Sequence, residues 1–86
     1  MNTEKIFGQV LRELRILNKL SQEKLSLECG LDRSYISLLE RGLRQPSLTT
    51  LLLFSKALNT TAANMVRDVE EILNENIKNG IFNKKR

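Results

Sequence analysis

The sequence has no histidine, no tryptophan and only one cysteine, Cys29. A single cysteine forms no disulfide within the chain, which excludes a small scaffold held together by disulfides. The side chains that most often bind zinc or activate a nucleophile are therefore almost missing, and there is no glycine-rich phosphate loop. We expect a protein that is not an enzyme, with no catalytic residue, no metal site and no cofactor. Cys29 is predicted to be a small buried apolar residue.

Long apolar runs are also missing. The longest candidate, residues 51–54, is far shorter than the ~18 residues that a membrane-spanning helix needs. The first five residues are mostly polar and do not form the apolar core of a secretory signal. Together with the lone cysteine, these features predict a cytoplasmic protein with no membrane partner. Nothing in the pattern predicts a small-molecule ligand.

A strong excess of one charge is missing from most of the chain. The formal net charge is +4, but the last three residues, Lys84, Lys85 and Arg86, supply three of these charges. Residues 1–83 therefore carry 11 basic and 10 acidic side chains. Net charge alone thus gives no argument for a nucleic-acid-binding face. We expect residues 79–86 to form a basic, flexible tail that could add nonspecific attraction to phosphates.

Leucine and isoleucine recur every three to four positions, a spacing typical of amphipathic helices. The pattern predicts an all-α fold in a single domain over residues 1–78. The five predicted helices span residues 4–18, 22–29, 33–41, 48–58 and 61–76. The predicted N-caps are Thr3, Ser21, Asp32, Ser47 and either Thr60 or Thr61.

Each predicted helix has a face that we expect to be buried. In the first helix this face comprises Phe7, Val10, Leu11, Leu14 and Leu17. In the fourth it comprises Leu48, Leu51, Leu52, Ser55 and Leu58. In the fifth it comprises Met65, Val66, Val69, Ile72 and Leu73. A chain of 86 residues has little core in which to bury all of these side chains, so part of the fifth helix is predicted to contact a second copy.

The second and third predicted helices have the pattern of a helix-turn-helix, over residues 21–41. This motif needs a small residue where the helices cross, a flexible residue in the turn, and apolar residues that fix the pair to the core. Counted from Gln22, the fourth, fifth, ninth, tenth, fifteenth and eighteenth positions have the required character. These residues are Leu25, Ser26, Gly30, Leu31, Ile36 and Leu39. The Ser26 hydroxyl can bond to a carbonyl one turn earlier.

The polar residues of the third helix fall in its first two turns. Arg33, Ser34, Tyr35 and Ser37 occupy the part of a recognition helix that enters the major groove. An arginine there can donate two hydrogen bonds to guanine, and the hydroxyls suit phosphates or base edges. Gln22, at the start of the second helix, is placed to meet a phosphate. Glu40 is predicted to be structural, bonded to nearby backbone or to an arginine.

The segments 20–23, 30–37, 40–42 and 44–48 together resemble the Cro/repressor-type (XRE) helix-turn-helix transcription regulators. The resemblance covers residues 6–73 and implies a five-helix, lambda-repressor-like DNA-binding domain. Within that family, the sequence of residues 31–37 is most similar to that of the controller proteins of restriction–modification systems. The resemblance implies a homodimer that binds an inverted-repeat operator and regulates transcription.

The resemblance also implies roles for individual residues. Arg33 would read bases, with Ser34 and Ser37 beside it. Contacts with phosphates or the minor groove would come from Gln22, Tyr35, Arg41, Gly42, Arg44 and Gln45. The dimer interface would consist of Leu53, Met65, Val66, Val69, Ile72 and Leu73.

Other interpretations remain open from the sequence. The same motif occurs in phage- or plasmid-type repressors and in antitoxin-like regulators. A fold does not by itself fix a function, so a protein–protein interaction module that kept the fold is a further alternative. The polar, arginine-bearing recognition face argues against that module, because a partner-binding face is typically more apolar.

Overall fold

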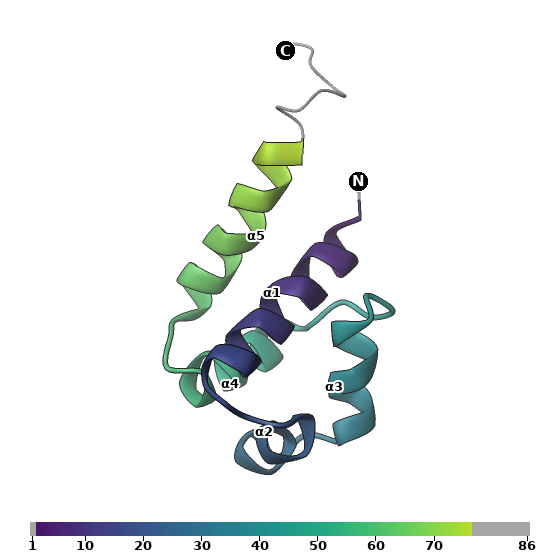
Figure 1. Ribbon diagram of the computed structural model, residues 1–86, viewed down its shortest axis with the longest axis vertical. Helices are drawn as coiled ribbons and strands as arrows, with labels where there is room; N and C mark the ends of the chain where they lie inside the picture. Colours follow the sequence, from purple (N-terminus) through teal and green to yellow (C-terminus); the bar gives the residue numbers. More distant parts are fainter. Residues whose placement is uncertain (1, 77–86) are drawn as a thin grey trace.

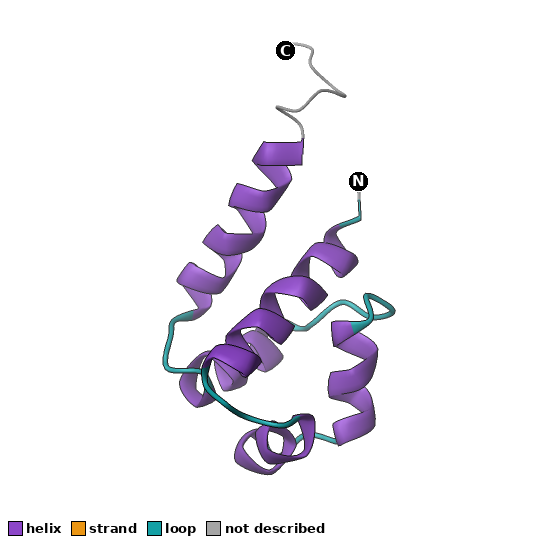
Figure 2. Cartoon of the chain, in the orientation of Figure 1, coloured by secondary structure: helices purple, strands orange, loops and turns teal. Residues whose placement is uncertain are grey.

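The computed structural model describes residues 2–76 and contains five α-helices and no strand over that range (Figures 1 and 2). The helices are α1 (Thr3–Leu17), α2 (Gln22–Cys29), α3 (Arg33–Glu40), α4 (Leu48–Ala57) and α5 (Ala62–Asn76). The predicted all-α class is confirmed, and the predicted ends agree to within about one residue. The predicted basic tail, 79–86, lies outside the described residues.

Three of the predicted N-caps are confirmed by side-chain hydrogen bonds. The Ser21 hydroxyl oxygen accepts from the backbone N–H of Lys24, 3.0 Å away, and the Ser47 hydroxyl accepts from the N–H of Thr50 at 3.1 Å. Of the two candidates before α5, Thr61 is the cap, because its hydroxyl oxygen accepts from a backbone N–H at 3.0 Å. Each cap satisfies a donor that the first helical turn leaves free.

The other two helix starts differ from the prediction. The prediction of Thr3 as a cap is wrong, because α1 begins one residue earlier and Asn2 caps it. The Asn2 side-chain oxygen accepts from the N–H of Lys5 at 3.0 Å. Asp32 does occupy the N-cap position of α3, but its side chain makes no capping hydrogen bond. The free N–H groups at that end of α3 remain available to another acceptor.

Helix α1 lies at the centre of the fold, packed against α3 on one side and α5 on the other (Figure 1). Helix α2 packs against α3 and α4, and α4 also packs against α5. The core holds the Phe7 and Phe54 rings, whose centroids lie 6.5 Å apart. The other buried members of this core are Leu11, Leu25, Cys29, Ile36, Leu39, Leu58 and Met65.

Gly8 allows α1 to come very close to the end of α3. A Cβ atom at this position would lie 2.5 Å from the backbone oxygens of Leu39 and Glu40. Real side chains do not accept such contacts with backbone atoms, so any larger residue would push the two helices apart. The glycine therefore fixes the distance between α1 and the last turn of α3.

The buried face predicted for α4 is partly wrong. Leu48 and Leu52 are 71% and 52% exposed, whereas Phe54 and Thr50 are buried. Almost every side of this helix carries apolar residues, so the sequence pattern does not identify the side that faces the core. Leu17 of α1 is likewise 76% exposed, since it lies at the last residue of its helix.

None of the helices in residues 2–76 is long and apolar enough to cross a membrane.

Candidate DNA-binding surface

The turn between α2 and α3 has the geometry that the helix-turn-helix pattern predicts. Gly30 adopts a left-handed conformation with φ of 71°. Its backbone N–H donates to the Ser26 carbonyl at 2.8 Å, and the N–H of Leu31 donates to the same oxygen at 3.1 Å. A left-handed residue at this point ends α2 and turns the chain toward α3 without strain, because glycine has no Cβ.

The six pattern positions fix this helix pair to the core. Leu25, Ile36 and Leu39 have no exposed surface, and Leu31 is partly buried against the same core. Ser26 is 8% exposed, and its hydroxyl donates to the Glu23 carbonyl at 2.7 Å, as predicted. This bond satisfies the one polar group that the helix crossing buries.

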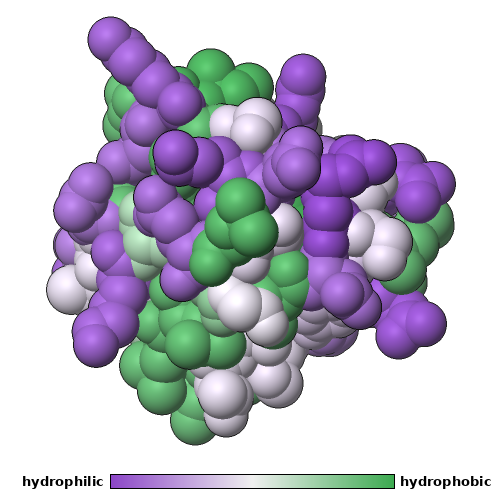
Figure 3. All heavy atoms as spheres, turned by 90° about the horizontal axis from the view of Figure 1, so that it is seen from below, coloured by the Kyte–Doolittle hydropathy of each residue, from purple (hydrophilic) through white to green (hydrophobic). Residues whose placement is uncertain are grey.

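The first turns of α3 present polar side chains to solvent. Arg33 and Ser34 are exposed, Ser37 is half-buried, and Tyr35 is half-buried with its side chain packed against the core. Figure 3 shows this end of the molecule from below, where hydrophilic side chains cover much of the surface between hydrophobic patches. The predicted base-reading residues are therefore accessible at the N-terminal end of α3.

A buried ion pair lies directly behind this surface. Arg15 of α1 donates through Nε and Nη2 to the two carboxylate oxygens of Glu40, at 2.6 and 3.0 Å. The two side chains are only 12% and 4% exposed, and Nη1 of the arginine also donates to the Leu20 carbonyl at 2.8 Å. The hydrogen bonds to Glu40 raise the pKa of Arg15 above its usual value. The predicted structural role of Glu40 is confirmed.

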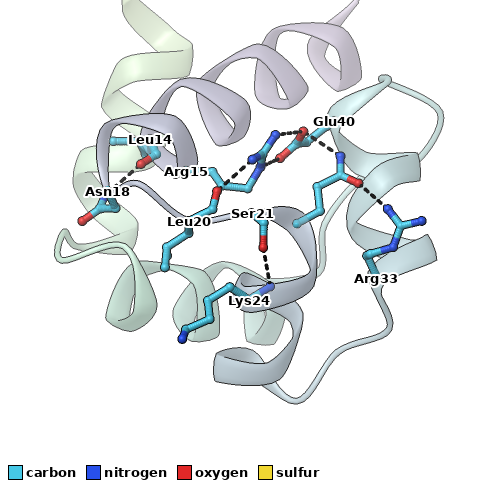
Figure 4. A network of polar contacts seen from close by, with 9 residues as sticks. Leu14, Arg15, Asn18, Leu20, Ser21, Lys24, Arg33 and Glu40 are labelled. Carbon is cyan, nitrogen blue, oxygen red and sulfur yellow. Dashed lines mark hydrogen bonds and ion pairs between the residues drawn. The ribbon is translucent and has the colours of Figure 1, made fainter.

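Gln22 connects this ion pair to the exposed Arg33. Figure 4 shows Arg15, Glu40 and Arg33 with the dashed contacts between them, which pass through one unlabelled side chain. Its amide nitrogen donates to Glu40 Oε1 at 3.0 Å, and its amide oxygen accepts from Nη1 of Arg33 at 3.1 Å. The four side chains form one polar network, which runs from the largely buried Arg15 side chain of α1 to the exposed first turn of α3. One amide hydrogen of Gln22 and four N–H donors of Arg33 remain for another partner.

Arg15 was not among the predicted site residues. A signal was present, because residue 15 follows Phe7 and Leu11 at intervals of four and so continues a row that faces the core. A charged residue in such a row needs a buried partner of opposite charge. Glu40 was the matching carboxylate, but only the packing of α1 on α3 shows that the two meet.

The predicted backbone-contacting residues lie in the loop between α3 and α4. Arg41, Arg44 and Gln45 are exposed, and Gly42 is half-buried with φ of 76°. A Cβ at Gly42 would come within 2.9 Å of the Lys5 backbone, so glycine is needed here for space as well as for conformation. This loop and the Arg33 end lie at opposite ends of α3, about 12 Å apart along an eight-residue helix.

Positive charge on this side of the molecule is not neutralised. Among residues 2–76, the pair of Arg15 and Glu40 is the one ion pair within 4.0 Å. Arg33, Arg41 and Arg44 therefore have no carboxylate partner in this part of the chain. Arginines without an ion-pair partner lie at or just beyond both ends of α3, an arrangement suited to the two strands flanking a DNA groove.

The structure separates the residues predicted for the dimer interface. Val66 is 49% exposed and lines a groove with Leu48 and Leu51 of α4, and Leu53 is 36% exposed. Met65 was predicted to contact a partner, but it has no exposed surface and belongs to this chain's own core. The remaining members of the set are half-buried: Val69, Ile72 and Leu73.

Cys29 is buried, as predicted, and its thiol donates to the Leu53 carbonyl at 3.8 Å. Burial, with a smaller effect from the charge of Glu28, raises the pKa of this thiol above its usual value. The protonated, unreactive form is thereby favoured. No group of three or more potential metal ligands occurs within residues 2–76.

A helix-turn-helix family model matches residues 11–63, which include the whole α2–α3 unit described above. The chain therefore belongs to the helix-turn-helix family of DNA-binding transcription regulators, as its sequence predicts. Its relatives within that family include control proteins. C.BamHI of Bacillus amyloliquefaciens is 48% identical over 58 residues, covering 66% of this chain and 72% of the relative. C.MunI of a Mycoplasma species is 40% identical over 73 residues, covering 83% of this chain and 99% of the relative.

Solved structures agree with this assignment. The restriction–modification controller protein C.AhdI from Aeromonas hydrophila superposes with a TM-score of 0.70 and 45% identity, covering 72% of this chain and 94% of that one. The controller protein C.Esp1396I, solved as a tetramer on its natural 35-base-pair operator, superposes with a TM-score of 0.74 and 28% identity. That match covers 85% of this chain and 97% of the other.

Proposed function

We propose that this chain is a controller-type regulator that binds an inverted-repeat operator as a homodimer, with Arg33 reading a base in each half-site. The observation that carries the proposal is the position of Arg33 at the start of α3, where its guanidinium donates a hydrogen bond to Gln22 of α2. Its free donors suit the two acceptors of guanine in the major groove. Ser34 and Ser37 lie beside it and extend the base-reading surface.

The polar network supports this role because it holds the Arg33 side chain in place before DNA binds. Gln22 is held by Glu40, which is itself fixed by two hydrogen bonds to Arg15. An arginine side chain held in one orientation loses less conformational entropy on binding than a free one. The remaining amide hydrogen of Gln22 would donate to a phosphate, so the same side chain would position both the base reader and the backbone.

Contacts with the DNA backbone are assigned to residues around Arg33. Gln22, Tyr35 and the α3–α4 loop residues would fix the register of α3 in the groove, and Arg44 would approach the minor groove. The loop residues in this set are Arg41, Gly42, Arg44 and Gln45. Such contacts act on any DNA sequence and should weaken with added salt, by roughly 0.9 log units per contact for each tenfold rise.

A dimer would supply a second recognition helix for the second half-site. Two copies related by a twofold axis would place their α3 helices about 34 Å apart, one turn of DNA. Three leucines of α4 are exposed and, together with Val66, support an apolar contact between copies on the α4–α5 side. They are Leu48, Leu52 and Leu53, at 71%, 52% and 36% exposed. Val69 and Leu73 are retained in this proposed interface. Met65 is removed from it because it is buried, and Ile72 is removed because it lines a separate groove between α1 and α5.

Similarity to the control protein C.BamHI and to the restriction–modification controller C.AhdI supports the controller role. The complex of the C.Esp1396I tetramer with its operator supports operator binding by an oligomer. A regulator of DNA acts where the DNA is, so we expect it to work in the cytoplasm. We expect regulation by binding alone, with no catalytic step and no cofactor.

The test is selection of bound DNA from a random pool, followed by sequencing. The expected result is an inverted repeat whose half-site centres lie one helical turn apart. Sedimentation of the protein with and without that DNA should give a dimer. Enrichment of single, unpaired sites, or a monomer at high protein concentration in both cases, would contradict the proposal.

A further inference from the structure

An apolar groove lies between α1 and α5. Helices α5 and α3 lie on opposite sides of α1, so the groove is on the side of α1 away from α3 (Figure 1). It has a volume of about 480 Å³. Its apolar lining comes from Val10, Leu14 and Leu17 of α1 and from Ile72 of α5. Val10 is buried, but Leu17 is 76% exposed although it continues the apolar stripe of its helix. The Leu17 end of the groove therefore has an apolar wall that nothing else in residues 2–76 covers.

The rim of the groove is acidic. The four carboxylates that line it are Glu13, Asp68, Glu71 and Glu75. None of them makes an ion pair within residues 2–76, where the only such pair is that of Arg15 and Glu40. An apolar floor with a negative rim suits a segment that combines apolar and basic side chains.

The sequence that follows α5 has this composition. Residues 77–86 contain four basic side chains, no acidic one, and three large apolar side chains, Ile77, Ile81 and Phe82. The Asn79-Gly80 pair between the apolar residues is a strong turn signal. A chain that reverses at this pair would run back along α5, with Ile81 and Phe82 ahead of the three basic residues.

The distances permit this path. Asp68 lies seven residues before Glu75 on α5, a rise of about 10 Å. The six residues after Gly80 span up to about 20 Å when extended. The segment is covalently joined to the end of α5, so its local concentration at the groove is in the millimolar range, about what short flexible linkers give. A weak contact is sufficient under these conditions.

We propose that residues 81–86 bind in cis in this groove, with Ile81 and Phe82 on the apolar floor and Lys84, Lys85 and Arg86 along the acidic rim. Because α1 separates the groove from α3, the bound segment is kept away from the DNA-binding surface (Figure 1). The last three residues supply most of the net charge but make no phosphate contact. The segment covers Leu17 and neutralises the carboxylates of α5.

The test places a nitroxide spin label at the end of the full chain through Asn83→Cys, in a Cys29→Ala background, which leaves all four basic residues intact. Amide signals of Val10, Leu14 and Ile72 are expected to lose at least half of their intensity relative to the reduced label. Amides of α3 should be unaffected. The loss should diminish in 1 M salt, which screens the acidic rim.

Two matched variants separate the contributions. In the labelled chain, Ile81→Ser with Phe82→Ser removes the apolar anchor and keeps the charge, and Glu71→Lys with Glu75→Lys reverses part of the rim. Each pair should restore at least half of the lost intensity. If neither does, the groove is not the binding site.

Mixed samples identify the source of the segment. Unlabelled ¹⁵N chain combined with labelled ¹⁴N chain should show no loss at the groove, because the contact is within one chain. Loss in that mixture would assign the groove to the segment of a second copy and overturn the proposal, as would absence of loss in the all-labelled sample. In DNA binding, the chain ending at Gly80 should have the same salt dependence as the full chain. A slope lower by one or more contacts would place the basic residues on DNA instead.

Discussion

The buried and exposed halves of the polar network differ in their surroundings, although the carboxylate of Glu40 joins them. In the buried half, Arg15 and Glu40 are 12% and 4% exposed and satisfy one another. In the exposed half, Arg33 reaches solvent and is held only through Gln22. Removal of a group from the buried half leaves a charge without water or partner, whereas removal from the exposed half leaves groups that water can solvate.

We expect this one network to serve two purposes. The buried half would stabilise the fold, and under the proposed function the exposed half would recognise DNA. Variants in the two halves should therefore separate in two measurements, the free energy of unfolding and the affinity for operator DNA.

The largest effect is expected from Arg15→Ala. The free energy of unfolding should fall by about 3–5 kcal/mol, because the carboxylate of Glu40 is left buried without its partner. Chemical denaturation measures this loss. Arg12→Ala, on an exposed site of the same helix, is the matched control and should stay within about 0.5 kcal/mol. Equal effects of the two substitutions would show that the ion pair is not a stability determinant.

The next effect is expected from Gly8→Ala. An exposed glycine in a helix is usually improved by alanine by up to about 1 kcal/mol. Here the new Cβ would meet two backbone oxygens of α3 at 2.5 Å, and the strain should instead destabilise the fold by about 1–3 kcal/mol. Thermal or chemical unfolding gives the sign directly. A more stable variant would mean that α1 and α3 tolerate a wider separation.

In the exposed half, Arg33→Ala should weaken operator binding by about 1–3 kcal/mol and relax the preference at one base pair per half-site. Titration of the selected operator and of single-base variants measures both quantities. The free energy of unfolding should change by less than about 0.5 kcal/mol, because the side chain is exposed. Unchanged affinity and base preference would contradict the assignment of Arg33 as base reader.

The smallest effect is expected from Gln22→Ala, with a loss of about 0.5–1.5 kcal/mol in operator binding from the missing hydrogen bonds. If Gln22 positions Arg33, the double variant Gln22→Ala with Arg33→Ala should lose less binding free energy than the sum of the two single losses. The difference should be at least about 0.5 kcal/mol. A double-mutant cycle on operator DNA measures this coupling. Strictly additive losses would leave Gln22 as an independent phosphate contact.

Much of this molecule could be predicted from the sequence because its determinants are local. Ser21, Gly30 and Ser47 mark helix ends through their own side chains or backbone freedom, and their roles do not depend on distant residues. The six helix-turn-helix positions were found for the same reason, since the motif is contained in one continuous segment.

The errors occurred where a local pattern allowed more than one answer. Helix α4 is apolar on nearly all sides, so Leu48 and Leu52 were assigned to the core although they face solvent, and Phe54 was missed. Met65 was assigned to a partner because the fifth helix carries a continuous apolar stripe. Only the way that α4 and α5 dock on α1 and α2 determines which side of each stripe is covered.

The sequence alone determined the helices, the turn at Gly30 and the polar residues at the start of α3. These features follow from spacing and from the conformational preferences of single residues. The tertiary structure brings Arg15 to Glu40, 25 residues away in the sequence. It also places Gln22 where it bonds to both Glu40 and Arg33. The physical reason is that a buried charge is stable only beside its partner, and the two become neighbours only when Gly8 lets α1 approach α3.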